Sequence, residues 1–353
     1  MSLTYVVGTG RCGSTMLSRI LQGHPEVLSL SEFWNIFLRA DEPVATRDIP
    51  TEDMTGDQYW QLLTRISPHH DGLAGTGIES YFGRRFDAAT GVPMICRTLG
   101  PIADDPDALY DALDGEVPGW PRQPFADHCR ALFGFIAGQL GRSVIVERSG
   151  GGIGALPTLR EQYPEARFVF LHRDGADSAL SMSRYPVFRL LAIKFIASYE
   201  DKRKNPKIPL LADGSKPRPE DFEGLLEPPF DVERFMSYPV SLQLFGAMWS
   251  MLTGDGVSEM LKLPPDRWTI LRYEQMLGDA RTELTRFAEF IGVSPDPRWL
   301  TAAEAYVDRG RRGSALAQLD PAALAALQAA CTPGTEAFGR LESEHAAAVG
   351  VLT

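Results

Sequence analysis

A glycine-rich loop near the beginning of the chain has the composition of an oxyanion-binding site. Its residues are Gly8, Thr9, Gly10, Arg11, Cys12, Gly13, Ser14 and Thr15. Glycines let successive backbone N–H groups point at one anion, and the helix expected to follow adds the positive end of its dipole. Ser14 stands where a Walker A loop has the lysine that reaches the β- and γ-phosphates, while Arg11 supplies a nearby cation. We therefore expect the loop to hold a phosphate-like group that has no triphosphate tail.

A second group of polar residues follows a later apolar run. Arg173 comes directly after the run that ends at His172, and Ser181 stands eight residues beyond Arg173. Open α/β sheets bind ligands at the carboxyl ends of their strands, which is where Arg173 would lie. A helix capped by Asp174 or Asp177 would carry Ser181 about two turns further, facing the same crevice. A guanidinium and a hydroxyl that converge on one group form a specific phosphate clamp.

The elements that must position these residues can be read from apolar periodicity. Short buried strands are predicted over 3–7, 27–30, 144–146, 167–171 and 268–271. Apolar residues at helical spacing follow the first run, and they occur again in a later segment that stops at Gly292. Asp320-Pro321 is typical of a helix start. The order strand, loop, helix, strand predicts an α/β fold with a central, mainly parallel sheet.

Two stretches interrupt this alternation, at residues 33–140 and 185–245. Both are rich in proline, glycine and aromatic residues, and their periodicity is weak. We interpret them as helical insertions that form a cap over a substrate pocket within a single domain, 1–353; elaboration of the surface is the alternative. The aromatic residues that are candidates for lining the pocket are Phe33, Trp34, Phe37, Tyr81, Phe82, Tyr185 and Phe188.

Composition and charge argue against several classes of protein. The 353 residues include 35 basic and 46 acidic side chains, so the formal net charge is −11. A chain this acidic is a poor candidate for binding nucleic acid or an anionic membrane, and local cations must hold any anionic ligand. There is no apolar run of transmembrane length and no signal-like start, so we expect a cytoplasmic protein. The four cysteines have neither zinc-ligand nor disulfide spacing.

Together, the two anion-binding motifs resemble those of the sulfotransferases that use 3′-phosphoadenosine 5′-phosphosulfate (PAPS). Residues 10–15 resemble the family's 5′-phosphosulfate loop, with Cys12 in place of a serine or threonine. Arg173 and Ser181 match the arginine–serine pair that binds the 3′-phosphate, at the same spacing. The resemblance implies a P-loop-like three-layer sandwich and a bacterial enzyme similar to carbohydrate and protein-tyrosine sulfotransferases.

Two later segments extend the resemblance. The sequence LRYEQML after the last apolar run resembles the family's L-x-Y-E-D-L segment, which implies that Tyr273 lies near the adenine. Arg311, Arg312 and Gly313 resemble the R-K-G loop that closes over the 3′-phosphate, with arginine in place of lysine. The four motifs occur in the family's order, and it is as a set that they are specific.

The resemblance also implies residues for the chemistry. Glu32 matches a glutamate proposed as general base, and Arg148 stands where the family's E-K-[ST]-P segment has a lysine facing the transferring group, with Gly150 in place of the proline. The acceptor, a small molecule, glycolipid or carbohydrate, would attack sulfur in line while Glu32 takes its proton. Adenosine 3′,5′-bisphosphate would leave, and N–H groups, Arg11 and Arg148 would stabilise the developing charge without a metal.

Two other functions are compatible with a glycine loop on such a sheet. An ATP-dependent small-molecule kinase needs a cation at the γ-phosphate and a carboxylate for Mg²⁺, and the loop lysine is missing. A nucleotide-binding protein without turnover is the second alternative, because Cys12, Arg148 and Gly150 depart from the family pattern. His24 and His172 are rival bases, but their positions favour a turn residue and a packed imidazole.

Overall fold

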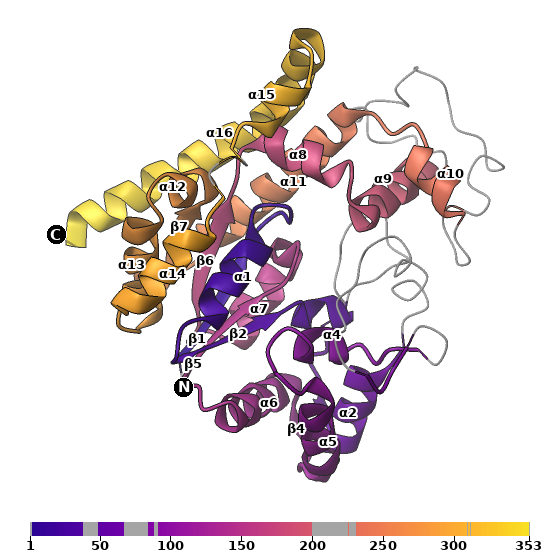
Figure 1. The fold of residues 1–353 in the computed structure, drawn as a ribbon, viewed down its shortest axis with the longest axis vertical. Helices are drawn as coiled ribbons and strands as arrows, with labels where there is room; N and C mark the ends of the chain where they lie inside the picture. Colours follow the sequence, from indigo (N-terminus) through magenta and orange to yellow (C-terminus); the bar gives the residue numbers. More distant parts are fainter. Residues whose placement is uncertain are drawn as a thin grey trace.

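A five-stranded parallel sheet forms the centre of the molecule (Figure 1), in the order β2-β5-β1-β6-β7. The computed structural model describes residues 2–37, 49–66, 84–87, 91–199, 225, 231–308, 310 and 312–352. The strands of the sheet are β1 (Ser2–Val7), β2 (Val27–Ser31), β5 (Val144–Arg148), β6 (Arg167–His172) and β7 (Trp268–Arg272). The five predicted strands are thus confirmed, each extended by one or two residues.

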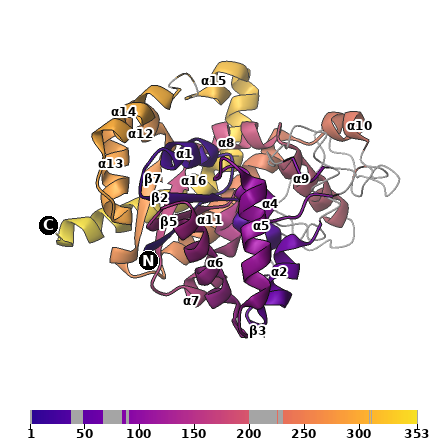
Figure 2. The same ribbon diagram turned by 60° about the horizontal axis from the view of Figure 1, so that its bottom comes forward.

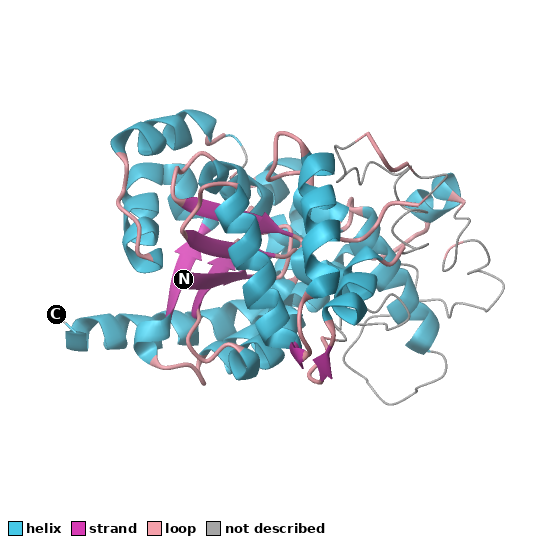
Figure 3. Ribbon diagram, turned by 90° about the horizontal axis from the view of Figure 1, so that it is seen from below, coloured by secondary structure: helices cyan, strands magenta, loops and turns pink. Residues whose placement is uncertain are grey.

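Side chains of β1 alternate between two hydrophobic clusters, one on each face of the sheet. Tyr5 and Val7 belong to one cluster and Val6 to the other, as the period of two along a strand requires. Figure 3 shows helices on both sides of the strands, and the three-layer α/β arrangement is therefore confirmed.

Each layer of helices contributes its apolar side chains to one cluster. The layer beside Val6 comprises α1 (Ser14–Gln22), α12 (Tyr273–Gly278), α13 (Ala280–Ile291) and α14 (Pro297–Tyr306). The opposite layer comprises α6 (Phe125–Gln139), η3 (Gly152–Ala155), α7 (Leu156–Gln162), α11 (Leu242–Met260) and α16 (Pro321–Leu352). The start of α16 at Pro321 and the end of α13 before Gly292 agree with the sequence prediction.

The stretch 33–140 only partly matches its interpretation as a cap. It holds η1 (Phe33–Phe37), β3 (Asp53–Met54), α2 (Gly56–Thr64), α4 (Cys96–Leu99), α5 (Pro106–Glu116), η2 (Val117–Gly119), β4 (Gln123–Pro124) and α6. Helix α6 packs against β5 and is part of a sheet-covering layer. Phe33, Trp34 and Phe37 are also buried in this core. Their proposed role in lining a pocket is wrong, because they pack edge to face against one another and against α6. Tyr81 and Phe82 lie outside the described residues.

A third hydrophobic cluster lies to one side of the sheet. It is built by α8 (Gly175–Met182), α9 (Pro186–Tyr199), α10 (Val232–Ser237), α11, α15 (Ser314–Gln318) and α16. Figure 2 shows α9 and α10 on the side of the molecule away from α13 and α14. None of the helices that the structure describes combines the length and the apolar character needed to cross a membrane.

Candidate active site

The glycine loop turns sharply between β1 and α1. Gly10 and Gly13 have φ angles of +81° and +92°, a region that side-chain-bearing residues rarely adopt. Neighbouring rings also leave no room there, because a Cβ at Gly10 would lie 2.5 Å from Phe188 and one at Gly13 would lie 2.2 Å from Tyr273. Arg11 has a positive φ of 54° as well, which is uncommon outside glycine. Glycine is thus required at both positions by backbone and packing together.

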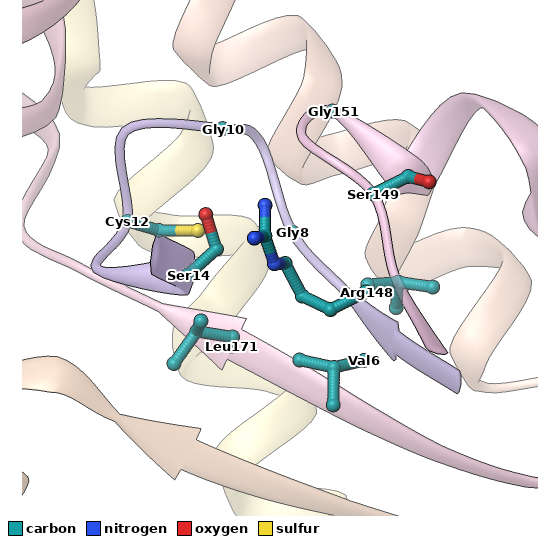
Figure 4. Close-up of a pocket in the computed structure, with 10 residues that line it drawn as sticks. Val6, Gly8, Gly10, Cys12, Ser14, Arg148, Ser149, Gly151 and Leu171 are labelled. Atoms are coloured by element: carbon teal, nitrogen blue, oxygen red, sulfur yellow. The ribbon is translucent and has the colours of Figure 1, made fainter. Parts of the chain in front are cut away.

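A small pocket opens beside this loop, with about 170 Å³ of space not filled by atoms, part of it open to solvent. It is lined by Val6, Val7, Gly8, Gly10, Cys12, Ser14, Arg148, Ser149, Gly151 and Leu171. In Figure 4 the Arg148 side chain extends toward the loop, and the Cys12 and Ser14 side chains lie within the turn. Burial raises the pKa of the Cys12 thiol, so this position contributes a neutral group. The positive charge in the pocket comes from Arg148.

Three side chains hold the guanidinium of Arg148 in place. Its Nε donates to Ser18 Oγ at 2.8 Å and its Nη2 donates to Ser31 Oγ at 3.1 Å. Its Nη1 donates to Glu32 Oε1 and forms an ion pair with it. Ser18 comes from α1 and Ser31 from the end of β2, so two elements fix a side chain that belongs to a third. Arginine can do this because its planar fork offers several donors, whereas lysine has one compact ammonium.

Glu32 follows β2 and is surrounded by N–H donors. Its backbone has a φ of +62°, and its N–H donates to the Arg148 carbonyl at 2.9 Å. Its Oε2 accepts hydrogen bonds from the backbone N–H of Gly150, at 2.9 Å, and from Asn35 Nδ2. A proline at position 150 would have no N–H to donate. The two departures from the family segment, Arg148 and Gly150, therefore both contact Glu32, whose side chain is still 28% exposed.

The second anion motif lies against the glycine loop. Arg173 Nη1 donates to the carbonyl oxygen of Arg11 at 3.2 Å, and Arg11 Nε donates to Ser181 Oγ at 3.0 Å. The Arg11 guanidinium also lies 4.4 Å from the ring centre of Tyr185. Asp174 caps α8 by accepting from the backbone N–H of Asp177 at 2.9 Å, which decides between the two predicted caps. The two predicted motifs therefore meet, although about 160 residues separate them.

Tyr273 and the C-terminal motif lie beside the arginine of this pair. Tyr273 is buried, its ring touches Gly13, and the Arg173 guanidinium lies 4.8 Å from its centre. A contact of Tyr273 with adenine stays a prediction. Gly313 directly precedes α15 and its N–H donates to Asp177 of α8, while Arg312 is exposed. Arg311 lies outside the described residues. Of the remaining loop residues, Thr15 is exposed on α1.

The two histidines considered as alternative bases, His172 and His24, make contacts typical of structural residues. His172 is buried and stacked on Phe338, and burial lowers its pKa to about 3. His24 Nδ1 accepts from the Glu26 backbone N–H at 3.2 Å, as a turn residue does.

Sequence reasoning missed Ser18, Ser31 and Asn35 as hydrogen-bond partners of Arg148 and Glu32. A serine directly before Glu32 was the one signal in the sequence that pointed to this network.

A family model and several solved structures match this chain. A family model described as "Sulfotransferase family" matches residues 4–192. A sulfotransferase domain from the Synechococcus PCC 7002 olefin synthase is similar in structure, with 16% identity and a TM-score of 0.46 over 96% of this chain and 94% of that one. A sulfotransferase from Alicyclobacillus acidocaldarius has 16% identity and a TM-score of 0.42 over 98% and 96% of the two chains. One from Mycobacterium tuberculosis H37Rv has 16% identity and a TM-score of 0.40 over 94% and 76%.

A comparison with curated proteins finds no match. The family model spans the glycine loop, Glu32, Arg148, Arg173 and Ser181 in one stretch. That stretch is more than half of the 353 residues. The chain therefore belongs to the sulfotransferase family.

Proposed function

We propose that the protein transfers a sulfuryl group from PAPS to a hydroxyl group of a small molecule, glycolipid or carbohydrate. The observation that carries the proposal is the contact between the two anion motifs, in which Arg173 bonds to Arg11 and Arg11 bonds to Ser181. A donor with phosphate groups at both the 5′ and 3′ positions needs two such motifs at the separation of one nucleoside. Membership of the sulfotransferase family supports the same donor.

In this proposal the 5′-phosphosulfate occupies the glycine loop. Backbone N–H groups of residues 10–15 and the start of α1 would hold its oxygens, and helix N-termini suit anions for this reason. Arg173 and Ser181 would hold the 3′-phosphate, with Arg312 and Gly313 approaching from the C-terminal side and Arg311 proposed beside them. Tyr273 lies under Arg173 and beside Gly13, so it would support both sites and contact the nucleoside between them.

The reacting groups would be Glu32, Arg148 and the acceptor hydroxyl. The acceptor oxygen forms a bond to sulfur as the bond from sulfur to the leaving phosphate oxygen breaks. Glu32 takes the hydroxyl proton, a role worth roughly 10²–10⁴-fold in rate. Arg148 and Arg11 stabilise the charge that develops on the leaving group. The ion pair between Glu32 and Arg148 supports this arrangement, because it holds the carboxylate beside Arg148, a residue that lines the pocket.

A transfer assay tests the proposal. The whole protein is incubated with sulfur-labelled PAPS and a panel of alcohols, phenols and glycolipids, or with a metabolite extract. We expect labelled product that depends on the protein and is inhibited by adenosine 3′,5′-bisphosphate. Calorimetry with ATP–Mg²⁺ serves as the comparison. Binding of ATP–Mg²⁺ in preference to the bisphosphate, or binding of the bisphosphate without transfer to any acceptor, would refute the proposal in favour of a kinase or a binding protein.

A further inference from the structure

A buried carboxylate on α8 is fully engaged by a distant segment of the chain. Asp177 is only 3% exposed. Its Oδ2 accepts from the Gly313 backbone N–H at 2.9 Å, and its Oδ1 accepts from the Ala315 N–H at 2.8 Å and from Ser314 Oγ at 3.2 Å. A buried carboxylate requires such donors, because removing it from water is otherwise very unfavourable. Asp177 therefore anchors the segment 313–315 to α8.

The same carboxylate faces the arginine of the second anion motif. Oδ2 of Asp177 lies 3.6 Å from Nη2 of Arg173, one helical turn earlier in the chain. The other terminal nitrogen of Arg173 donates to the carbonyl of Arg11. A continuous line of contacts thus runs from segment 313–315 through Asp177 and Arg173 to the glycine loop.

Stabilising its own helix does not account for this arrangement. The N-cap of α8 is Asp174, whose side chain accepts from the Asp177 N–H, so the capping function is already filled. Gly313 has a φ of +72°, a conformation that glycine adopts without strain. This turn brings the N–H groups of residues 313 and 315 to the same carboxylate. Arg312 directly precedes Gly313, so anchoring Gly313 also restricts where the Arg312 guanidinium can reach.

We propose that Asp177 is a positioning residue that couples occupation of the anion site at Arg173 and Ser181 to the order of segment 312–315. The inference rests on the proposed function, because it takes the bound anion to be the 3′-phosphate of the donor. The carboxylate fixes one side of the Arg173 guanidinium and holds the C-terminal segment beside the same group. Selectivity for nucleotides that carry a 3′-phosphate therefore depends on Asp177.

The test uses Asp177→Asn in the whole protein. The amide keeps the size of the side chain, but its nitrogen cannot accept a hydrogen bond. At least one N–H of segment 313–315 therefore loses its hydrogen-bond partner. Adenosine 3′,5′-bisphosphate and adenosine 5′-monophosphate are titrated by calorimetry. We expect bisphosphate affinity to fall at least about tenfold, and monophosphate affinity to change less than about twofold. Asp174→Asn is the matched control, because it removes a charge from the same helix end and remains a good cap; it should change both affinities less than about twofold.

Trypsin cleavage after Arg312 provides a readout independent of affinity. We expect cleavage to be faster in Asp177→Asn than in the unaltered protein, and the bisphosphate to slow cleavage only in the latter. Equal loss of both nucleotides, or unchanged discrimination between them, would overturn the coupling and leave the proposed donor intact. Failure of the unaltered protein to bind the bisphosphate would overturn the proposed function and the coupling with it. Should Asp177→Asn not fold, Ser314→Ala removes a single donor and decides the matter: about two- to threefold weaker bisphosphate binding supports the coupling, and no change contradicts it.

Discussion

Arg173 Nη1 donates a 3.2 Å hydrogen bond to the carbonyl oxygen of Arg11, which lies 162 positions earlier in the chain. The contact joins the end of β6 to the turn that follows β1, and these strands are neighbours in the sheet. Parallel pairing brings their carboxyl ends to one edge, where ligands of such sheets bind. The sheet topology is therefore what brings two separate anion motifs within reach of one ligand.

Arg173→Ala tests the second motif by itself. The guanidinium is only 10% exposed and would make charge-assisted bonds to the 3′-phosphate. We expect binding of adenosine 3′,5′-bisphosphate to weaken by about 1.5–3 kcal/mol. A nucleotide without the 3′-phosphate should bind almost as before. Calorimetry with both ligands measures the difference, and equal weakening of the two would show that Arg173 does not read the 3′-phosphate.

Glu32→Gln separates chemistry from binding. The amide preserves the shape of the side chain but cannot accept the acceptor's proton. We expect turnover to fall by roughly 10²–10⁴-fold, while the affinity for the bisphosphate stays within about threefold. Single-turnover transfer from labelled PAPS, together with calorimetry, provides both numbers. Turnover equal to that of the unaltered protein would exclude Glu32 as the base.

Arg148→Lys tests whether the fixed guanidinium matters beyond its charge. One ammonium cannot bond to Ser18, Ser31 and Glu32 in the observed geometry, so Glu32 would lose its orientation. We expect turnover to drop by about 10-fold or more, with a smaller change in donor affinity. Arg340→Lys, on the exposed side of α16, is the matched control and should behave like the unaltered protein. Full turnover in Arg148→Lys would show that Arg148 acts only through its positive charge.

We expect His172 to lower the free energy of unfolding as the pH falls below about 6.5. Both ring nitrogens lack hydrogen-bond partners among the described residues, and burial lowers the pKa to about 3. The unfolded chain binds a proton near pH 6.5, whereas the folded protein does not. Its contribution to stability is complete above about pH 6.5 and declines by at most about 1.4 kcal/mol per pH unit toward pH 3. Urea unfolding at several pH values should show a shallower decline for His172→Phe; parallel curves would contradict the assignment.

Strand positions were predictable because burial on both faces leaves continuous apolar runs such as 167–171. The motifs at Arg11 and Arg173 were predictable because each occupies a short stretch directly after a strand. The network around Arg148 was not, since its partners Ser18 and Glu32 lie 130 and 116 positions away. The pairing of β2 with β5 is what brings Glu32 next to Arg148.

The prediction that the aromatic residues after Glu32 line a pocket was wrong for a related physical reason. Phe33 and Trp34 have the composition of a ligand-binding surface, yet both are fully buried. What buries them is α6, whose Phe133 packs edge to face against Phe33. Local composition could not reveal which distant helix would cover the run.

A crystal structure of the protein with adenosine 3′,5′-bisphosphate tests the central claim most directly. The account predicts one bound nucleotide whose 5′-phosphate accepts hydrogen bonds from the backbone N–H groups of residues 10–15. Its 3′-phosphate should lie within hydrogen-bond distance of Arg173 and Ser181, with the nucleoside spanning the space between. A nucleotide bound with only one phosphate at these motifs, or bound elsewhere on the molecule, would contradict the two-site donor cradle and the sulfuryl transfer built on it.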